Sequence, residues 1–367
     1  MTSIFFEIKE LFRRERLYRL LLVLIIVFYI GVFFLHKLVM TKNDENIVQK
    51  NQQQVDQLLS KAPQKPELLE QRVSKRPWLL RSIQLFFLFF LSALGMGIWL
   101  LFSTLRRLFL RKKAIPSTHR KLHIAWGISE VVRVVILFFI LAIVLNLVLS
   151  VYFAAVKFAF DWDSDRSLLM LIHTLLLDTG VIFLIVFSVR KSGAALPDLL
   201  GFKFSKFPIR EVWWGVRTYL LFLPILMGLL TVLIYLASRL AYEPSTHPLV
   251  NILLKDKKLS FGVLFSSLFV ACIVGPIVEE IFFRGFFYPA LRKYLGVGRT
   301  MVVTAILFAM VHENMFAFLP IFFLGLVLCY LYEKRANLLS CISLHMMHNT
   351  VFLAYFFLLK SLLVGGK

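Results

Sequence analysis

The stretch Gly275-Pro276-Ile277-Val278-Glu279-Glu280-Ile281-Phe282-Phe283-Arg284-Gly285 places two adjacent carboxylates and an arginine inside a long apolar run. A charge inside hydrocarbon costs at least about 2.5 kcal/mol, so such residues are rare in a membrane segment unless they pair, face a cavity or act chemically. On a helix, Glu280 and Arg284 are four residues apart and share one face, whereas Glu279 points about 100° away. The spacing predicts a Glu280–Arg284 ion pair and leaves Glu279 for another partner.

The composition is that of a membrane protein. Of 367 residues, 59% are hydrophobic and 38 are phenylalanine, and the mean hydropathy is +0.79. Soluble domains are roughly 45–50% apolar, and several runs here reach the about 20 residues that a helix needs to cross a bilayer. We predict an all-α, polytopic transmembrane bundle of eight or nine spans. The count depends on residues 300–332, which have to hold two short crossings around Pro320, one of them partial or re-entrant.

The net charge of +21 comes from basic residues in short loops between the apolar runs. This distribution is typical of the positive-inside signal, so we do not expect nucleic-acid binding. Basic residues before the first span, at about 20–38, predict an uncleaved anchor with a cytoplasmic N-terminus. The polar segment 41–80 is then expected outside. The dense basic loop 106–121 is expected inside, as a topology signal or, alternatively, as a binding region for anionic lipid.

A basic connector at residues 190–213, interrupted by Gly193 and Pro197, marks an internal boundary. We divide the chain there into N-terminal transmembrane helices with the outer polar segment, residues 1–200, and a C-terminal transmembrane core, residues 201–367. The N-terminal part carries few charges in its spans, and the core carries the polar motifs.

Three smaller features are expected to be structural. The acidic loop 161–165 suits solvation better than calcium binding. His173 and Asp178 are five residues apart in one span and are expected to form a local polar contact. The cysteines all lie in apolar runs, which predicts buried thiols rather than disulfides or a metal cage: Cys272, Cys329 and Cys341.

Polar side chains in two later helices lie at the depth of the glutamates. Glu279 lies 13 residues before the basic end of its helix, and His312 lies 13 residues after the basic start of the next. At about 1.5 Å per residue, both are about 20 Å from that boundary, and the same count puts His345 at about 15 Å. His345 and Asn349 share one helical face. We therefore expect Glu279, His312 and His345 to converge within the membrane.

At these residues the sequence resembles a known family. Glu-Glu-x-x-x-Arg at 279–284, Phe-x-x-x-His at 308–312 and His-x-x-x-Asn at 345–349 are similar, in kind and order, to the three motifs of the CPBP intramembrane endopeptidases, the CaaX prenyl protease 2 or ABI type. The resemblance covers about residues 210–360. It implies a helical core around a membrane-embedded cavity that opens to the cytosol.

The resemblance also implies roles for individual residues. Glu279 and His312 would activate a water molecule, and His345 and Asn349 would form the oxyanion hole, with the Glu280–Arg284 pair in support. His348 is not part of the pattern, and we expect it to serve packing. The implied substrate is a peptide or protein presented at the membrane, with or without a lipid. We expect an integral multi-pass protein of a bacterial plasma membrane.

Peptide hydrolysis needs a base for water and donors aimed at the developing oxyanion, and these side chains can supply both. One alternative keeps the same site but makes Glu279, His312 and His345 ligands of zinc, with an open fourth position. We favour the cofactor-free glutamate mechanism because Asn349 is a poor zinc ligand and no His-Glu-x-x-His motif is present. Two further alternatives are a transporter that relays protons through these residues and a silent membrane scaffold.

Overall fold

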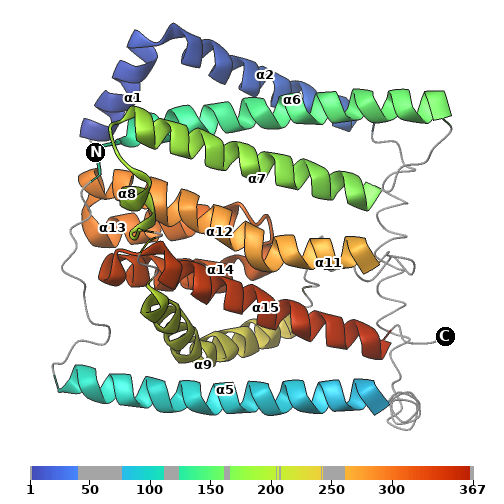
Figure 1. Cartoon of the computed structure of the whole chain (residues 1–367), viewed down its shortest axis with the longest axis vertical. Helices are drawn as coiled ribbons and strands as arrows, with labels where there is room; N and C mark the ends of the chain where they lie inside the picture. Colours follow the sequence, from blue (N-terminus) through green and yellow to red (C-terminus); the bar gives the residue numbers. More distant parts are fainter. Residues whose placement is uncertain are drawn as a thin grey trace.

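The computed structural model describes residues 2–39, 77–110, 124–160, 166–203, 205, 208–240, 242 and 261–363, and every regular element in these ranges is a helix. Eight stretches are helical, long and apolar enough to cross a membrane. Most of them run in roughly one direction through a single bundle (Figure 1). The all-α transmembrane bundle predicted from composition is therefore confirmed.

Several predicted loops lie outside the described residues: the polar segment 41–80 up to residue 76, the basic loop 106–121 after residue 110, and the acidic loop 161–165. The sides of the membrane assigned to them, and the cytoplasmic N-terminus, stay predictions.

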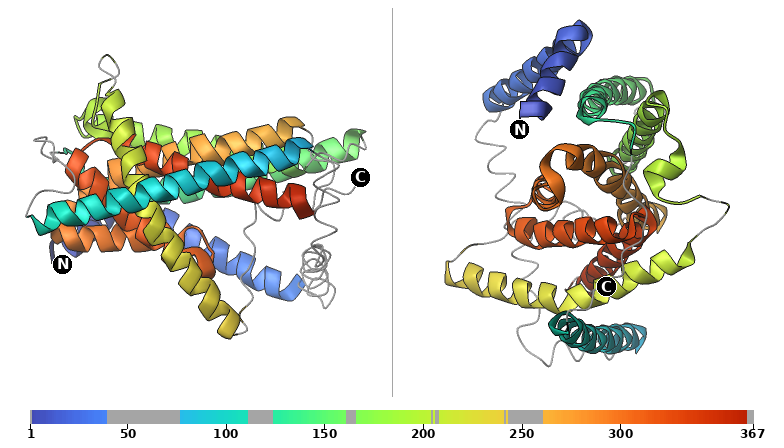
Figure 2. Two further views of the ribbon diagram at one scale, coloured as in Figure 1. Left: turned by 90° about the horizontal axis from the view of Figure 1, so that it is seen from below. Right: turned by 90° about the vertical axis from the view of Figure 1, so that its left-hand side faces the viewer.

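The helices before the connector are organised around α6. Helices α1 (Thr2–Arg14), α2 (Arg16–Val39) and α7 (Arg166–Lys191) all pack against α6 (Ile128–Phe160). Helix α5 (Pro77–Phe109) does not join this group. It packs instead on the far side of the bundle, against α9 of the C-terminal core (Figure 2).

The C-terminal core consists of helices that contact one another closely. In chain order these are α9 (Ile209–Arg239), α11 (Phe261–Phe269), the π-helix η2 (Val270–Val274), α12 (Gly275–Glu280), the π-helix η3 (Ile281–Phe287), α13 (Tyr288–Met310), α14 (Met315–Arg335) and α15 (Leu338–Leu363). The short α8 (Leu196–Leu200), which ends at the proposed boundary, packs against α7 and η3. Helix α13 packs against η3 and α14, and α15 packs against α9, α12 and α14.

The chain turns back on itself within α13. Phe308 lies under the Arg284 guanidinium, 4.3 Å from its central carbon to the ring centroid, although 24 residues of straight helix would separate them by about 36 Å. The reversal occurs at Gly296, whose φ of 72° and ψ of −178° interrupt the helix. Glycine reaches this conformation without the steric cost that a Cβ imposes. The helical segment 297–310, which follows Gly296, is too short to cross about 30 Å of hydrocarbon. The partial crossing expected near Pro320 is therefore this segment, and it precedes the helix that contains Pro320.

Helices α9 and α15 approach closely at a glycine. A Cβ on Gly215 would collide with the Ser343 side chain and the Ser340 carbonyl of α15. Ser343 also donates a hydrogen bond across this contact to the carbonyl of Val212. Small residues of this kind let membrane helices pack backbone to backbone, and here they fix the position of the helix that carries His345.

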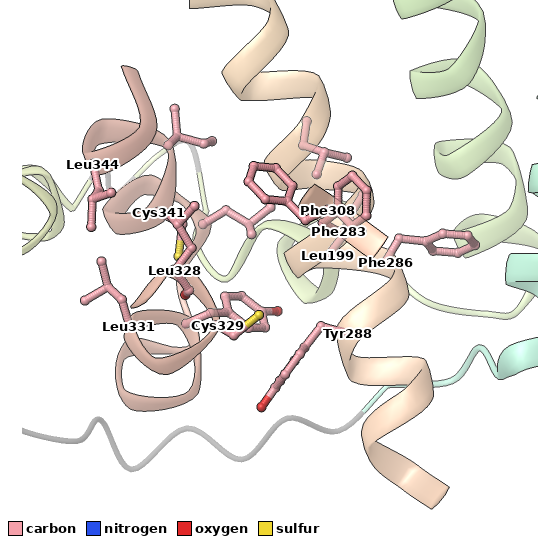
Figure 3. Packing of buried hydrophobic residues seen from close by; sticks show 14 of the residues in the cluster. Leu199, Phe283, Phe286, Tyr288, Phe308, Leu328, Cys329, Leu331, Cys341 and Leu344 are labelled. Carbon is pink, nitrogen blue, oxygen red and sulfur yellow. The ribbon is translucent and has the colours of Figure 1, made fainter. Parts of the chain in front are cut away.

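Aromatic and aliphatic side chains fill the space between η3, α13, α14 and α15 (Figure 3). Phe283 and Phe308 meet edge-on, with 5.2 Å between ring centroids. The buried Cys329 and Cys341 and the half-buried Cys272 are all free thiols, so the predicted absence of disulfides agrees with the structure for these three residues.

Contacts cross the proposed boundary near residue 200. The indole of Trp126 donates to the Phe286 carbonyl (3.0 Å), and Lys293 donates to the Trp126 carbonyl (2.6 Å). The division into residues 1–200 and 201–367 stays a prediction. The expected contact between His173 and Asp178 does not form, since no hydrogen bond joins these two described side chains and His173 Nε2 is buried without a partner. Asp178 instead lies close enough to Glu279 for the two carboxylates to repel each other.

Candidate active site

The helix that carries the two glutamates is locally widened. Before α12, the Gly275 N–H bonds to the Val270 carbonyl, five residues back, which is the π-helical pattern. In that register the Ala271 carbonyl would pair with residue 276, but Pro276 has no N–H. The Asn349 side chain of α15 replaces this missing N–H, because its Nδ2 donates a hydrogen bond to the Ala271 carbonyl (2.9 Å). Pro276 therefore leaves one carbonyl of the helix without a backbone donor, and a side chain from another helix supplies the hydrogen bond.

Glu280 lies at the centre of a buried polar network. Its Oε1 accepts from Arg284 Nη1 (2.8 Å) and lies 2.9 Å from His345 Nδ1, and neither Glu280 nor Arg284 is exposed. Arg284 Nη2 also donates to the Gly325 carbonyl (3.2 Å). The ion pair predicted from spacing is present. The contact with His345 was not predicted, because nothing in the sequence links residues 65 positions apart.

Glu279 faces the other way and remains partly exposed. Its Oε2 lies 3.9 Å from His312 Nε2 and 4.0 Å from His345 Nε2, and this oxygen has no hydrogen-bond partner within the described structure. The side chain of Glu279 is 33% exposed, against 0% for Glu280. The three groups expected to converge from separate helical segments are therefore together, and the two adjacent glutamates have different surroundings.

The second nitrogen of each histidine is already occupied. His312 Nδ1 lies 2.7 Å from the Phe308 carbonyl, and His345 Nδ1 lies on the carboxylate of Glu280. Both partners only accept, so each Nδ1 carries hydrogen and each Nε2 is unprotonated while its ring is neutral. Glu279 and two imidazoles thus present three acceptor atoms to one space. Such a space suits a water molecule, a shared proton or a cation.

Zinc fits this site in donor chemistry and less well in spacing. Two imidazoles with anchored Nδ1 atoms and one carboxylate are a common zinc set. Two ligands at about 2.1 Å from a tetrahedral zinc lie about 3.4 Å apart, whereas the atoms here are 3.9 and 4.0 Å apart. Within the described ranges, no group of three or more His, Cys, Asp or Glu side chains is arranged to hold a metal.

Asn349 and His348 lie on the same helix as His345 but have different surroundings. One amide hydrogen of Asn349 is used by the Ala271 carbonyl, and a second remains because the amide carries two. The His348 ring packs against Tyr219 and Phe352, with centroids 6.0 and 6.3 Å away. The packing expected for His348 is thus present, although its Nδ1 is buried without a partner in the part of the chain described.

Comparison with known proteins agrees with the three motifs. Residues 261–351 match the family model for Rce1-like type II CAAX prenyl endopeptidases. This match agrees with the resemblance to the CPBP family carried by the three motifs. It begins with α11 and ends two residues after Asn349, so it contains all three motifs of the candidate site.

A curated relative carries a related description. The chain is 31% identical over 81 residues to the Bacillus subtilis (strain 168) protein YdiL, whose name describes it as a candidate membrane peptidase. The alignment covers 22% of this chain and only about a third of that protein's length, 33%. No solved structure matches the chain.

Replacing Glu280 should be far more destabilising than replacing Glu279. Glu280→Gln leaves the buried Arg284 charge without its counter-ion, and breaking a buried pair from one side costs about 3–5 kcal/mol. Glu279→Gln removes a charge from a partly exposed group with no ion-pair partner other than the two histidines. Thermal unfolding of both variants in one detergent measures the difference. Equal melting temperatures would contradict the assignment of Glu280 to the buried network.

Asn349 and Pro276 should be energetically coupled. Asn349→Ala leaves the Ala271 carbonyl without its donor, a loss of about 1–3 kcal/mol for a buried acceptor. Pro276→Ala gives residue 276 an N–H that can reach the preceding turn. The double variant should therefore recover about 1 kcal/mol relative to the sum of the two single losses. Thermal unfolding of the four proteins tests this, and strictly additive losses would show that Asn349 does not replace the missing N–H.

Proposed function

We propose that this protein is an intramembrane endopeptidase that hydrolyses a peptide bond near the membrane. The observation that carries the proposal is the environment of Glu279. It is a partly exposed carboxylate beside two oriented imidazoles, while Oε1 of its buried neighbour Glu280 contacts one of them and Arg284. The matched family and the description of the curated relative support the same class of reaction.

In the proposed mechanism, Glu279 and His312 hold the attacking water. A water within about 2.8 Å of two atoms can span separations up to about 5.6 Å, so the 3.9 Å gap between Glu279 Oε2 and His312 Nε2 accommodates one. The water oxygen attacks the carbonyl carbon of the scissile peptide bond as a proton passes to Glu279. That proton then goes to the leaving amine, directly or through His312, when the C–N bond breaks.

His345 and Asn349 are proposed as oxyanion donors, and in each side chain other hydrogen bonds limit which hydrogen can be donated. His345 Nε2 can donate only when the ring is protonated, because its Nδ1–H faces Glu280. Asn349 has one amide hydrogen left after bonding to Ala271. Preorganised donors of this kind are each worth about 10²–10³ in turnover.

A zinc-dependent peptidase with the same residues is the second candidate. The unprotonated Nε2 atoms of His312 and His345 favour it, since both rings present lone pairs to the space beside Glu279. Bound zinc would supply an activated water and polarise the substrate carbonyl. In this form Glu279, His312 and His345 would hold the metal, and their spacing would have to shorten.

The proposed substrate is a peptide or protein presented at the membrane, with or without a lipid. Purified protein in liposomes, offered a library of membrane-anchored peptides, tests this. Wild type should cleave at least one, and Glu279→Gln should lose at least about 10³-fold in turnover while keeping its melting temperature. Proton flux without cleavage would indicate the transporter alternative, and neither activity would indicate a scaffold.

Treatment with a tight chelator followed by desalting should leave the peptidase active, with far less than one zinc per chain by elemental analysis. The glutamate mechanism does not need a metal, so added zinc should not raise turnover. Stoichiometric zinc, with activity lost on chelation and restored by zinc alone, would replace this mechanism with the metal-dependent one.

A further inference from the structure

Helix α1 is turned across the bundle. Glu15, which is not helical, separates α1 from α2. Figure 1 shows a sharp bend between the two helices: α2 runs along the bundle beside α6, whereas α1 runs across the end where α5 and α7 finish in basic turns. The first candidate membrane span begins at Arg16, after α1. Helix α1 therefore ends where the chain enters the membrane, and its axis lies close to the membrane plane.

One side of α1 is held against the bundle. Leu11 is 4% exposed, and Ile4 and Ile8 pack against the main hydrophobic cluster. The hydroxyl group of Tyr294 in α13 donates a hydrogen bond to Glu7 Oε1. These contacts fix the rotation of α1 about its axis. The directions of its other side chains then follow from the 100° that separates successive residues of a helix.

Phe12 marks the side of α1 that faces the membrane interior. It packs on a small cluster formed by Ile25 of α2 with Ile136 and Ile143 of α6, all of which belong to candidate membrane spans. Phe5 lies seven residues earlier and therefore points in nearly the same direction, but it is 70% exposed. A bare phenylalanine ring on the side of α1 that faces the membrane interior is placed to enter lipid.

The charged side chains of α1 follow the same orientation. Glu10 and Arg14 lie on the side opposite Phe5, and Arg14 Nε donates a hydrogen bond to Glu10 Oε1 (2.6 Å). Lys9 and Arg13 lie between these two sides, on the surface turned away from the bundle. Arg13 contacts Glu10 (2.8 Å) but is 72% exposed, and Lys9 has no ion pair within the described structure. The basic side chains thus lie between the apolar side and the acidic side.

We propose that α1 is an interfacial helix that binds anionic phospholipid at the membrane surface. Phe5 enters the acyl chains, and Lys9 and Arg13 contact headgroup phosphates. Helices with basic residues beside an apolar side typically lie in the headgroup plane, and long basic side chains reach from there to the phosphates. A free anion would make no use of Phe5. The bound lipid would also hold Glu7 against Tyr294, close to the reversal of the chain within α13.

The test is hydrogen exchange of the full-length protein in lipid nanodiscs, with the amides of residues 2–14 followed by mass spectrometry. Each basic residue near an anionic surface contributes about fivefold. Exchange of α1 should therefore be about 5- to 25-fold slower in phosphatidylglycerol than in phosphatidylcholine. Lys9→Gln with Arg13→Gln should remove this difference. The matched control, Arg190→Gln with Lys191→Gln, removes two charges from the end of α7 on the same side and should keep it.

The apolar contact has its own pair of variants. Phe5→Gln should speed the exchange of α1 by about tenfold or more in both lipids, because a buried phenylalanine ring contributes at least that much. Phe6 is the matched control, since it is 68% exposed but points about 100° away from Phe5. Phe6→Gln should therefore have a smaller effect than Phe5→Gln. Equal effects of the two variants would contradict the proposed orientation of α1.

Several results would overturn the lipid site. One is equal exchange of α1 in the two lipids, and another is the same loss of the lipid difference in the α7 control. The same slowing by millimolar inorganic phosphate in phosphatidylcholine would indicate a free anion. Protection that follows the number of chains per nanodisc rather than the lipid would indicate a second copy on this face.

Exchange of the remaining helices in the same spectra shows whether each variant is folded. Should the double variant unfold, Lys9→Gln alone keeps the test, with an expected loss of about fivefold. None of these measurements depends on peptidase activity.

Discussion

The buried contact among Glu280, Arg284 and His345 is the interaction on which the candidate site depends. A carboxylate and a guanidinium without exposure to solvent are stable only when each is paired and hydrogen-bonded, and here each has more than one partner. The network joins α12 and η3, which are adjacent in the chain, to α14 and α15 further along it. It also fixes which nitrogen of His345 points at Glu279, so the structural charge pair sets the chemistry of its neighbour.

Departures from regular helix place other side chains of the site around that network. The reversal at Gly296 brings Phe308 back over Arg284 and places His312 beside Glu279. The π-helical turn before Pro276 frees a carbonyl that Asn349 then binds. π-Helical turns are frequent at functional sites because the inserted residue changes the direction of the side chains around it. Here it lies one turn before the two glutamates.

The two neighbouring glutamates have different roles because they differ in burial. Glu280 is enclosed by cationic and imidazole partners, so its charge is used for structure. Glu279, one residue away, is partly exposed and faces the Nε2 atoms of His312 and His345. That arrangement leaves Glu279 with a free acceptor, which a base needs, and it also explains why zinc is the natural rival to a water molecule at this place.

The sequence by itself determined the membrane helices, the Glu280–Arg284 pair and the depth at which Glu279, His312 and His345 meet, because hydropathy, helical spacing and residue counts are local properties. Only the tertiary structure decided the rest. Three interactions between helices depend on how each helix is rotated about its own axis, and counting residues along the sequence does not give that rotation. They are the contact of His345 with Glu280, the hydrogen bond from Asn349 to the Ala271 carbonyl and the repulsion between Asp178 and Glu279. His173 and Asp178 illustrate the limit. Their spacing suggested a local contact, but side chains five apart on a helix point in different directions, and α7 packs against α12, the helix that carries Glu279.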